Sequence, residues 1–205
     1  MYYPNFFEEK KLLKQGFKSV AGLDEAGRGP LSGPVVAAAV IIKSNEKFLK
    51  GINDSKKLSE KQRDYFYKIL MRHKEIKRGI GIVSEKVIDK INILEATKLA
   101  MQKAVEDLGL KPDFLLIDGN FTLRQAQGEK YILQKSIIKG DAKVISISAA
   151  SIIAKVTRDR IMLKYDKKYP EYGFKKHKGY PTLSHRKILK KIGPCPIHRK
   201  TFSWK

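Results

Sequence analysis

The longest uninterrupted apolar run in this chain is Val35–Ile42, inside an almost wholly apolar segment that extends from Pro34 to Lys43. Eight residues are far fewer than the ~20 that a membrane-spanning helix needs. The run is rich in β-branched residues, and a strand without polar positions has no face to offer to water. The segment therefore predicts a strand that is central in a sheet or buried on both faces.

Strands and helices alternate along the rest of the chain. Residues 19–27 begin as an apolar strand and end in a turn, and the Gly- and Pro-rich loop 28–34 joins this strand to the apolar run as a hairpin. Further strands are predicted at 78–83, 114–117 and 131–138, and helices at 59–75, 94–108, 143–168 and 183–192. This order predicts an α/β fold with a mixed sheet flanked by helices.

The charge of the chain indicates its class of partner. Its 205 residues carry a formal net charge of +22, yet 42% of them are hydrophobic, which excludes a disordered basic tail. Residues 155–205 hold 16 Lys and Arg against three acids. A folded protein with such an excess most often binds nucleic acid, and an anionic membrane surface is the lesser alternative. We expect one domain over 1–205, with a core at about 19–160 and a basic helical extension at about 161–205.

Cysteine content and the N-terminus indicate the compartment. Cys195 is the only cysteine, so neither an intramolecular disulfide nor a cysteine-based zinc cluster can form. Residues 1–5 show no basic segment followed by an apolar one, as a secretory signal would. These features predict a cytoplasmic protein, and we expect a monomer because no apolar helix face lacks a plausible role in the core.

Four carboxylates fall where predicted buried strands give way to turns: Asp24, Glu25, Asp118 and Asp141. Acids at such positions can simply form turns or cap helices, and for Asp141 alone that explanation is as good as a functional one. The adjacent pair Asp24 and Glu25 is different, because two anions at the mouth of a core strand repel each other unless a cation lies between them. That cation is either Lys or Arg, or a divalent metal.

Other constellations are weaker. The four histidines (His73, His177, His185 and His198) show no metal-ligand spacing, and we expect surface positions or phosphate contacts for them. The loop from Gly27 to Gly33 is not a Walker motif because no Gly-Lys-Ser/Thr follows it. Next to paired acids, however, its free backbone N–H groups can approach a sugar-phosphate backbone.

Five segments together resemble the motifs of bacterial ribonuclease HII, in the same order along the chain. They are Gly22-Leu23-Asp24-Glu25-Ala26-Gly27-Arg28-Gly29-Pro30-Leu31, Asn53-Asp54-Ser55-Lys56-Lys57-Leu58, Leu116-Ile117-Asp118-Gly119-Asn120, the segment Lys139–Asp159, and His177-Lys178-Gly179-Tyr180-Pro181-Thr182. The resemblance implies an RNase H-like fold and cleavage of the RNA strand in RNA–DNA hybrids. It also implies incision 5′ of single ribonucleotides embedded in duplex DNA.

The resemblance further implies roles for particular residues. Asp24, Glu25, Asp118 and Asp141 would be the catalytic acids and would hold two Mg²⁺ or Mn²⁺ ions. The products would carry 5′-phosphate and 3′-hydroxyl ends. Substrate-binding residues would be Gly27, Arg28 and Gly29 at the 2′-hydroxyl and its phosphates, Tyr180 against the neighbouring deoxynucleotide sugar, and Lys56 near the scissile phosphate.

Alternatives remain at this point. Lys56 is one lysine among many and has Lys57 beside it, so a solvent-exposed position without a role in the site is the alternative for it. Asp159 is either an accessory acid or, as we favour, an i,i+4 partner of Lys155. A ribonuclease HIII-like enzyme is the nearest rival, although that family carries an additional N-terminal domain and Glu as its fourth acid. A non-catalytic basic nucleic-acid-binding protein would share the charge but has no reason to place acids at strand ends.

Overall fold

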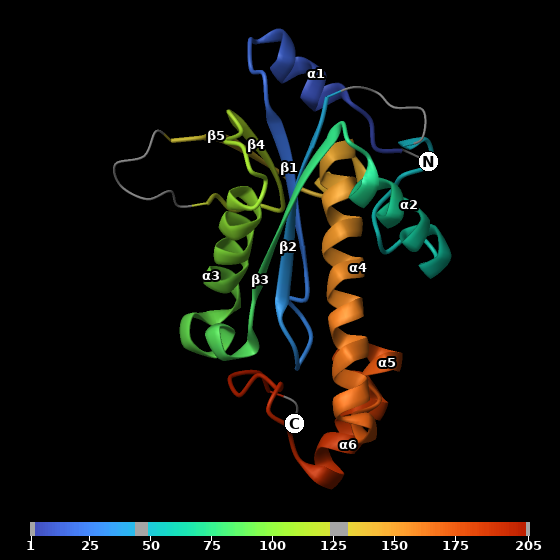
Figure 1. The fold of residues 1–205 in the computed structure, drawn as a ribbon. Coiled ribbons are helices and arrows are strands. Elements are labelled where there is room, and N and C mark those ends of the chain that lie inside the picture. The colour runs from blue at the N-terminus through green and yellow to red at the C-terminus, as the bar shows by residue number, and fades with distance from the viewer. Residues whose placement is uncertain (1–2, 44–48, 124–130, 204–205) are drawn as a thin grey trace.

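Five strands form one mixed sheet in the order β3-β2-β1-β4-β5 (Figure 1). The computed structural model describes residues 3–43, 49–123 and 131–203. The strands are β1 Val20–Ala26, β2 Val35–Ile42, β3 Ile76–Val83, β4 Phe114–Asp118 and β5 Leu133–Ile137. The β1–β2 and β2–β3 pairs are antiparallel, whereas β4 runs parallel to both β1 and β5. The predicted hairpin and the predicted mixed α/β sheet are confirmed.

Helices cover both faces of this sheet, with α3 on one side and the long α4 on the other (Figure 1). The helix α2 packs beside α4, α1 lies at one end of the molecule, and α5 and α6 lie at the opposite end. The helices are α1 Phe7–Lys14, α2 Glu60–Arg72, α3 Glu85–Glu106, α4 Ile145–Lys168, α5 Phe174–His177 and α6 Leu183–Ile192, with short 3₁₀ turns at η2 Gly140–Ala142 and η3 Pro170–Tyr172. None of the helices in the described ranges is long and apolar enough to cross a membrane.

The central strand β2 is buried along its whole length, as its apolar run predicts. Successive side chains alternate between the two faces of a strand. Ala38 and Val40 therefore belong to the core under α2 and α4, while Ala37 and Ala39 belong to the core under α3. Small side chains on both faces let both helix layers approach the sheet closely.

The helix α4 approaches β1 closely where the two cross. A Cβ atom at Gly22 would collide with the backbone and side chain of Ser146 in the first turn of α4. Only glycine on the strand and a small residue on the helix allow this contact. The contact brings the N-terminal end of α4 next to the end of β1 that carries Asp24.

The boundaries of several elements differ from the sequence-based expectations. The helix α3 starts at Glu85 rather than near Leu94, and Asn92 breaks it with a φ of 64°. The Asn92 side chain then accepts hydrogen bonds from the amides of Leu94 and Glu95, as an N-cap does. The expected start therefore matches the second, regular half of the helix. The helix α1 was not predicted, because its eight residues carry too few apolar positions to show a helical period.

Candidate active site

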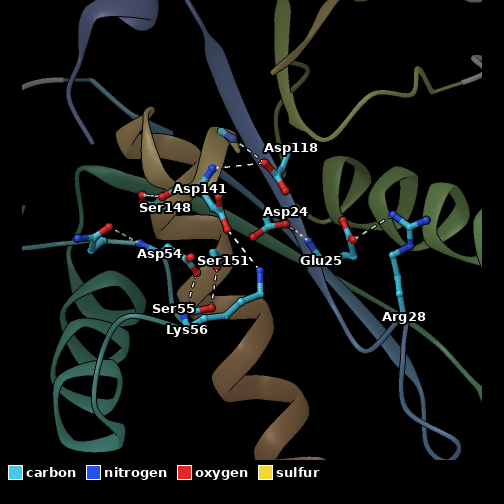
Figure 2. Close-up of polar contacts among 12 residues, drawn as sticks. Asp24, Glu25, Arg28, Asp54, Ser55, Lys56, Asp118, Asp141, Ser148 and Ser151 are labelled. Atoms are coloured by element: carbon cyan, nitrogen blue, oxygen red, sulfur yellow. Dashed lines mark hydrogen bonds and ion pairs between the residues drawn. The ribbon is translucent and has the colours of Figure 1, made fainter. Parts of the chain in front are cut away.

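Three of the four predicted acids meet at one end of the sheet (Figure 2). The parallel pairing of β1 with β4 sets Leu23 opposite Ile117, so Asp24 and Asp118 follow at the carboxyl ends of neighbouring strands. Asp141 comes from η2, between β5 and α4. One carboxylate oxygen from each of Asp24, Asp118 and Asp141 lies within 4.8 Å of the other two.

The backbone around Asp141 is held by its neighbours. Asp118 Oδ1 accepts hydrogen bonds from the amides of Gly140 (2.7 Å) and Asp141 (3.4 Å). The Ser148 hydroxyl donates to the carbonyl oxygen of Asp141. A Cβ atom at Gly140 would crowd Ile147 and the Asp118 carboxylate. Asp118 thus orients the turn that presents Asp141, in addition to contributing its own carboxylate.

Burial and the neighbouring carboxylates disfavour the charged forms of Asp24 and Asp141. Burial, followed by the charges of Glu25, Asp118 and Asp141, raises the pKa of Asp24 well above its usual value. Burial and the charge of Asp118 likewise raise the pKa of Asp141. Such groups cost free energy in the folded protein unless a cation joins them.

Glu25 lies apart from the trio because adjacent residues of a strand point to opposite faces (Figure 2). Its Oε1 is 3.6 Å from Nη1 of Arg28. Burial raises the pKa of Glu25, and the opposing attraction of Arg28 only partly offsets this effect. The second oxygen, Oε2, is buried and has no hydrogen-bond partner within the described ranges. Glu25 therefore lies beside the three aspartates, and its Oε2 lacks a hydrogen-bond partner among the described residues.

Lys56 reaches the acids from the loop that precedes α2. Its Nζ is 3.5 Å from Asp141 Oδ2. Burial disfavours the Lys56 ammonium, but the attraction of Asp141, Asp54 and Asp24 outweighs it, so the pKa of Lys56 is raised. The neighbouring Ser55 accepts a hydrogen bond from Ser151 of α4 at 2.8 Å, which anchors the loop. Of the two lysines weighed from the sequence, Lys56 is the one that the structure places at the acids.

The trio fits the divalent cations that the resemblance implies. Its ligand atoms are hard carboxylate oxygens, which Mg²⁺ and Mn²⁺ prefer. The buried, unpartnered Oε2 of Glu25 and the raised pKa values of Asp24 and Asp141 both mark a shortage of positive charge. In the described part of the chain, Lys56 forms an ion pair with Asp141 but with no other member of the trio, and the acid that Arg28 pairs with is Glu25.

Two buried arginines organise the loop that follows β1. Arg199 donates to the carbonyl oxygens of Gly27 (2.6 Å), Arg28 (2.9 Å) and Gly33 (2.9 Å). Arg158 of α4 donates to the carbonyls of Ser32 and Pro34 and, with Nη1, to that of Lys178, each at 3.0 Å. Arg158 thereby ties the Gly27–Gly33 loop to the Lys178–Tyr180 turn, which is about 150 residues away in the sequence.

The peptide groups of the first loop face in a defined direction. All described peptide bonds are trans, so a carbonyl and the following N–H point opposite ways. Because Arg199 binds the carbonyls of Gly27 and Arg28, the N–H groups of Arg28 and Gly29 point away from it. Both residues are exposed. The loop therefore presents two N–H donors outward, next to the acids.

Tyr180 lies beside this loop. A Cβ atom placed on Gly29 would be 3.9 Å from Cε1 of the Tyr180 ring. The ring is 38% exposed, and Lys155 Nζ and the Arg158 guanidinium each lie 5.7 Å from its centre. Leu31, within the loop, donates its N–H to the carbonyl oxygen of Gly179 at 2.8 Å. The two segments expected to read the substrate are thus adjacent.

The structure also corrects the expectations for histidine. His177, His185 and His198 are buried rather than on the surface, because the segments that carry them pack around the ring of Phe174. Lys155 and Asp159 form the favoured i,i+4 ion pair at 2.8 Å.

Sequence reasoning missed Arg158 and Arg199 as contributors to the site. A signal for Arg158 was present, since it continues the i,i+4 row of Ala150 and Ala154 on the buried face of α4.

Comparison with known proteins agrees with this geometry. The family model for Ribonuclease HII matches residues 21–205. The ribonuclease HII of Chlamydia muridarum is 54% identical over 195 residues, which cover 95% of this chain and 87% of the relative. The crystal structure of ribonuclease H2 from Pyrococcus horikoshii OT3 is similar with a TM-score of 0.69 and 33% identity, over 91% of this chain and 95% of the other.

A second solved structure is a complex of ribonuclease HII with PCNA from Archaeoglobus fulgidus, with a TM-score of 0.72 and 25% identity over 92% of this chain and 96% of that one. The extent of these matches, and the placement of the matching motifs around one group of acids, lead to a single assignment. The chain belongs to the ribonuclease HII family of hydrolytic nucleases.

Proposed function

We propose that this ribonuclease, whose family degrades the RNA of RNA–DNA hybrids, also incises duplex DNA on the 5′ side of a single embedded ribonucleotide. The products would carry 5′-phosphate and 3′-hydroxyl ends. The observation that carries this proposal is the contact between the Gly27–Gly33 loop and the Lys178–Tyr180 turn, beside the acids. Two adjacent recognition elements suit the reading of two consecutive nucleotides.

In this proposal Asp24, Glu25, Asp118 and Asp141 hold two divalent ions, Mg²⁺ or Mn²⁺. When bound, the ions supply an activated water and stabilise the leaving 3′-oxygen of an in-line displacement. The protein's part is to keep the carboxylates in place. Asp118 does so through its hydrogen bonds to the amides of Gly140 and Asp141. Three carboxylates that repel one another in the free protein bind cations strongly for the same reason.

Lys56 and Arg28 add positive charge at the edge of the acid group. The Lys56 side chain is 78% exposed, although its Nζ reaches Asp141. It can therefore move with a phosphate that approaches the acids. Arg28 is 44% exposed by its side chain and pairs with Glu25. We assign both residues to phosphate binding, Lys56 at the scissile phosphate and Arg28 next to the ribose.

Recognition of ribose rests on the outward N–H groups of Arg28 and Gly29. The 2′-hydroxyl is the group that distinguishes RNA from DNA, and it both donates and accepts hydrogen bonds. Gly27 and Gly29 let the backbone come close to the sugar. Tyr180, next to Gly29, then packs its ring on the following deoxyribose. The N–H groups and the tyrosine ring together therefore suit a ribonucleotide that is followed by a deoxyribonucleotide.

Metal-dependent nicking of an end-labelled DNA duplex that contains one ribonucleotide tests the proposal. We expect a single cut on the 5′ side of the ribonucleotide with Mg²⁺ or Mn²⁺, and none after chelation with EDTA. An all-DNA duplex of the same sequence is the control. Cleavage of RNA–DNA hybrid without incision of the single-ribonucleotide duplex would limit the enzyme to hybrids, and binding without any cleavage would make it a non-catalytic protein.

The setting in which this reaction takes place is also part of the proposal. We propose that the enzyme acts as a cytoplasmic monomer on RNA–DNA hybrids and on DNA with embedded ribonucleotides. The high positive charge of residues 155–205 supports nucleic acid as the partner. The PCNA complex of the archaeal relative concerns that protein, and size-exclusion chromatography with light scattering would test the monomer.

A further inference from the structure

Three of the four histidines form a buried cluster beneath the turn that carries Tyr180. His177 belongs to α5, His185 to α6 and His198 to the returning C-terminal segment, and their exposed fractions are 8%, 0% and 6%. The rings of His177 and His185 stack with centres 4.2 Å apart and planes 15° apart. The ring of Phe174 packs edge-on against His177 and His185. Nothing in the proposed chemistry uses these imidazoles.

The hydrogen bonds of the cluster define the proton on each ring. The N–H of Cys195 donates to His198 Nδ1 at 2.9 Å, which is shorter than the 3.2 Å from this nitrogen to the Cys195 carbonyl oxygen and to its sulfur. We therefore place the proton of His198 on Nε2. That Nε2 lies 3.0 Å from Nε2 of His185, which must therefore accept. His185 then carries its proton on Nδ1, which donates to the carbonyl oxygen of Tyr180 at 2.9 Å. A relay of donors thus runs from Cys195 through His198 and His185 to Tyr180.

His177 supports the same turn from the other side. The N–H of Gly179 donates to His177 Nδ1 at 3.1 Å, and His177 Nε2 donates to the carbonyl oxygen of Tyr172 at 2.9 Å. With Arg158 on the carbonyl of Lys178, each residue from Lys178 to Tyr180 has a backbone group bound by a buried side chain. Buried side chains therefore hold the backbone of this turn from the protein interior, while the Tyr180 ring reaches the surface.

We infer that His185, oriented by His198, is a positioning residue that fixes the Tyr180 turn so that the tyrosine ring can read the sugar next to the ribonucleotide. The inference rests on the proposed function of Tyr180. His185 does not touch substrate; it acts through its hydrogen bond to the Tyr180 carbonyl. A displacement of about 1 Å at a positioning contact can lower a rate by as much as 10²-fold. The hydrogen bond from His185 to the Tyr180 carbonyl therefore matters, because the tyrosine ring has to be aligned with the sugar.

The geometry requires neutral imidazoles. A charged His185 would point an N–H from Nε2 at His198, and His198 cannot turn its acceptor toward it because that acceptor already receives the Cys195 N–H. Burial lowers the pKa of all three histidines. Neutral rings with fixed tautomers make a rigid support, because each ring nitrogen then has a hydrogen-bond partner of the complementary kind.

A double-mutant cycle tests whether His185 acts through Tyr180. The quantity measured is the preference, defined as the single-turnover rate on a duplex with one ribonucleotide divided by the rate on a duplex with a complete RNA strand. We expect His185→Leu to lower the preference by about 10-fold, and His185→Asn to keep most of it, because an asparagine amide near the position of Nδ1 can still donate to Tyr180. In a Tyr180→Ala background, His185→Leu should change the preference no further.

Because the preference is a ratio of two rates, it distinguishes a positioning effect from partial unfolding of the variant. Partial unfolding lowers the active fraction and reduces both rates equally, which leaves their ratio unchanged. His73→Leu, at the C-cap of α2 and outside the cluster, is the matched control and should leave the preference unchanged. Equal effects of His185→Leu in the wild-type and Tyr180→Ala backgrounds would overturn the inference. Absence of incision by the wild-type enzyme would instead overturn the proposed function.

A measurement without catalysis tests the relay itself. In protein with ¹⁵N-labelled histidine, long-range ¹H–¹⁵N correlation spectra report the tautomer of each of the four rings. At pH 7 we expect His185 with its proton on Nδ1, and His177 and His198 with theirs on Nε2. A His185 that is charged, or protonated on Nε2, would refute the relay. The His198→Leu variant should broaden or shift the His185 signals, because it removes the donor to Nε2.

Discussion

Glu9 of α1 caps the N-terminus of α4 by binding Ser146. Its Oε1 accepts a hydrogen bond from the Ser146 amide at 3.0 Å and another from the Ser146 hydroxyl at 2.8 Å. The residue at the N-cap position of α4 is Val144, which offers no side-chain cap. A carboxylate from another helix therefore satisfies a donor in the first turn. The cap lies within five residues of Asp141 and so supports the turn that presents it.

We expect Glu9→Ala to destabilise the protein by about 1–3 kcal/mol, because it leaves a buried N–H without an acceptor. Glu9→Gln keeps an acceptor oxygen and should cost less. Glu8→Ala is the matched control: Glu8 pairs with Lys135 at 2.7 Å across a partly exposed surface, which is worth about 1 kcal/mol or less. Urea unfolding followed by circular dichroism gives the free energies. Equal losses for Glu8→Ala and Glu9→Ala would contradict the capping role.

Asp24→Asn and Asp118→Asn should abolish cleavage while the fold is retained. Loss of one ligand costs several kcal/mol of transition-state stabilisation, or ~10³-fold or more in rate. In metal-free buffer we expect Asp24→Asn to raise the melting temperature, because it removes a buried charge that Asp118 and Asp141 repel. Rates within a few-fold of wild type in either variant would refute the assignment of these acids.

Tyr180→Ala should lose far more activity on a single ribonucleotide than affinity for plain duplex DNA, since phosphate contacts survive the substitution. Single-turnover cleavage and equilibrium binding are compared for wild type and variant. Tyr169→Ala, a second tyrosine of the C-terminal part that touches neither loop in the contacts described, serves as the control. Equal losses of cleavage and binding would mean that Tyr180 only supports the turn.

Binding of duplex substrate should weaken steeply with salt. With catalysis blocked by Ca²⁺, the log–log slope is expected to be about −0.9 for each phosphate neutralised on a B-form duplex. Lys175 and Lys176 are exposed on α5, and Lys178 follows them next to Tyr180. Replacing the three with glutamine should flatten the slope by ~1 for each lysine that contacts a phosphate. An unchanged slope would place the binding surface on another face of the molecule.

The contribution of His185 to the stability of the folded protein should fall as the pH drops below about 6.5. Burial lowers the pKa of His185 from 6.5 to about 4, so the unfolded chain binds this proton more readily than the folded one between those values. Stability from this group is then complete above pH 6.5 and is lost as the pH falls toward 4, by on the order of 3 kcal/mol. His185→Asn should have a shallower pH dependence of its unfolding free energy over that range, and parallel curves would contradict the prediction.

Local patterns were enough to predict much of this protein. The apolar run Val35–Ile42 indicated the buried central strand. The helix predicted at 59–75 corresponds to α2, which begins at a capping box of Ser59 and Gln62. Asp24, Asp118 and Asp141 stood out because each follows a predicted strand. Strand burial, helix capping and turn formation depend on residues close together in the chain, so these features can be read without knowledge of the fold.

Contacts between distant segments were decided by the tertiary structure alone. Arg158 joins the loop after β1 to the Tyr180 turn, and Arg199 holds the carbonyls of that loop from the C-terminal segment. Arg158 and Arg199 are two of the 43 Lys and Arg in the sequence. The i,i+4 row of α4 marks Arg158 as a buried position, but nothing local shows which groups either guanidinium binds. Their role depends on which carbonyl groups the folded chain brings within reach. The same holds for His185 and His198, whose burial and tautomers follow from the path of the polypeptide after α4 rather than from their neighbours in the sequence.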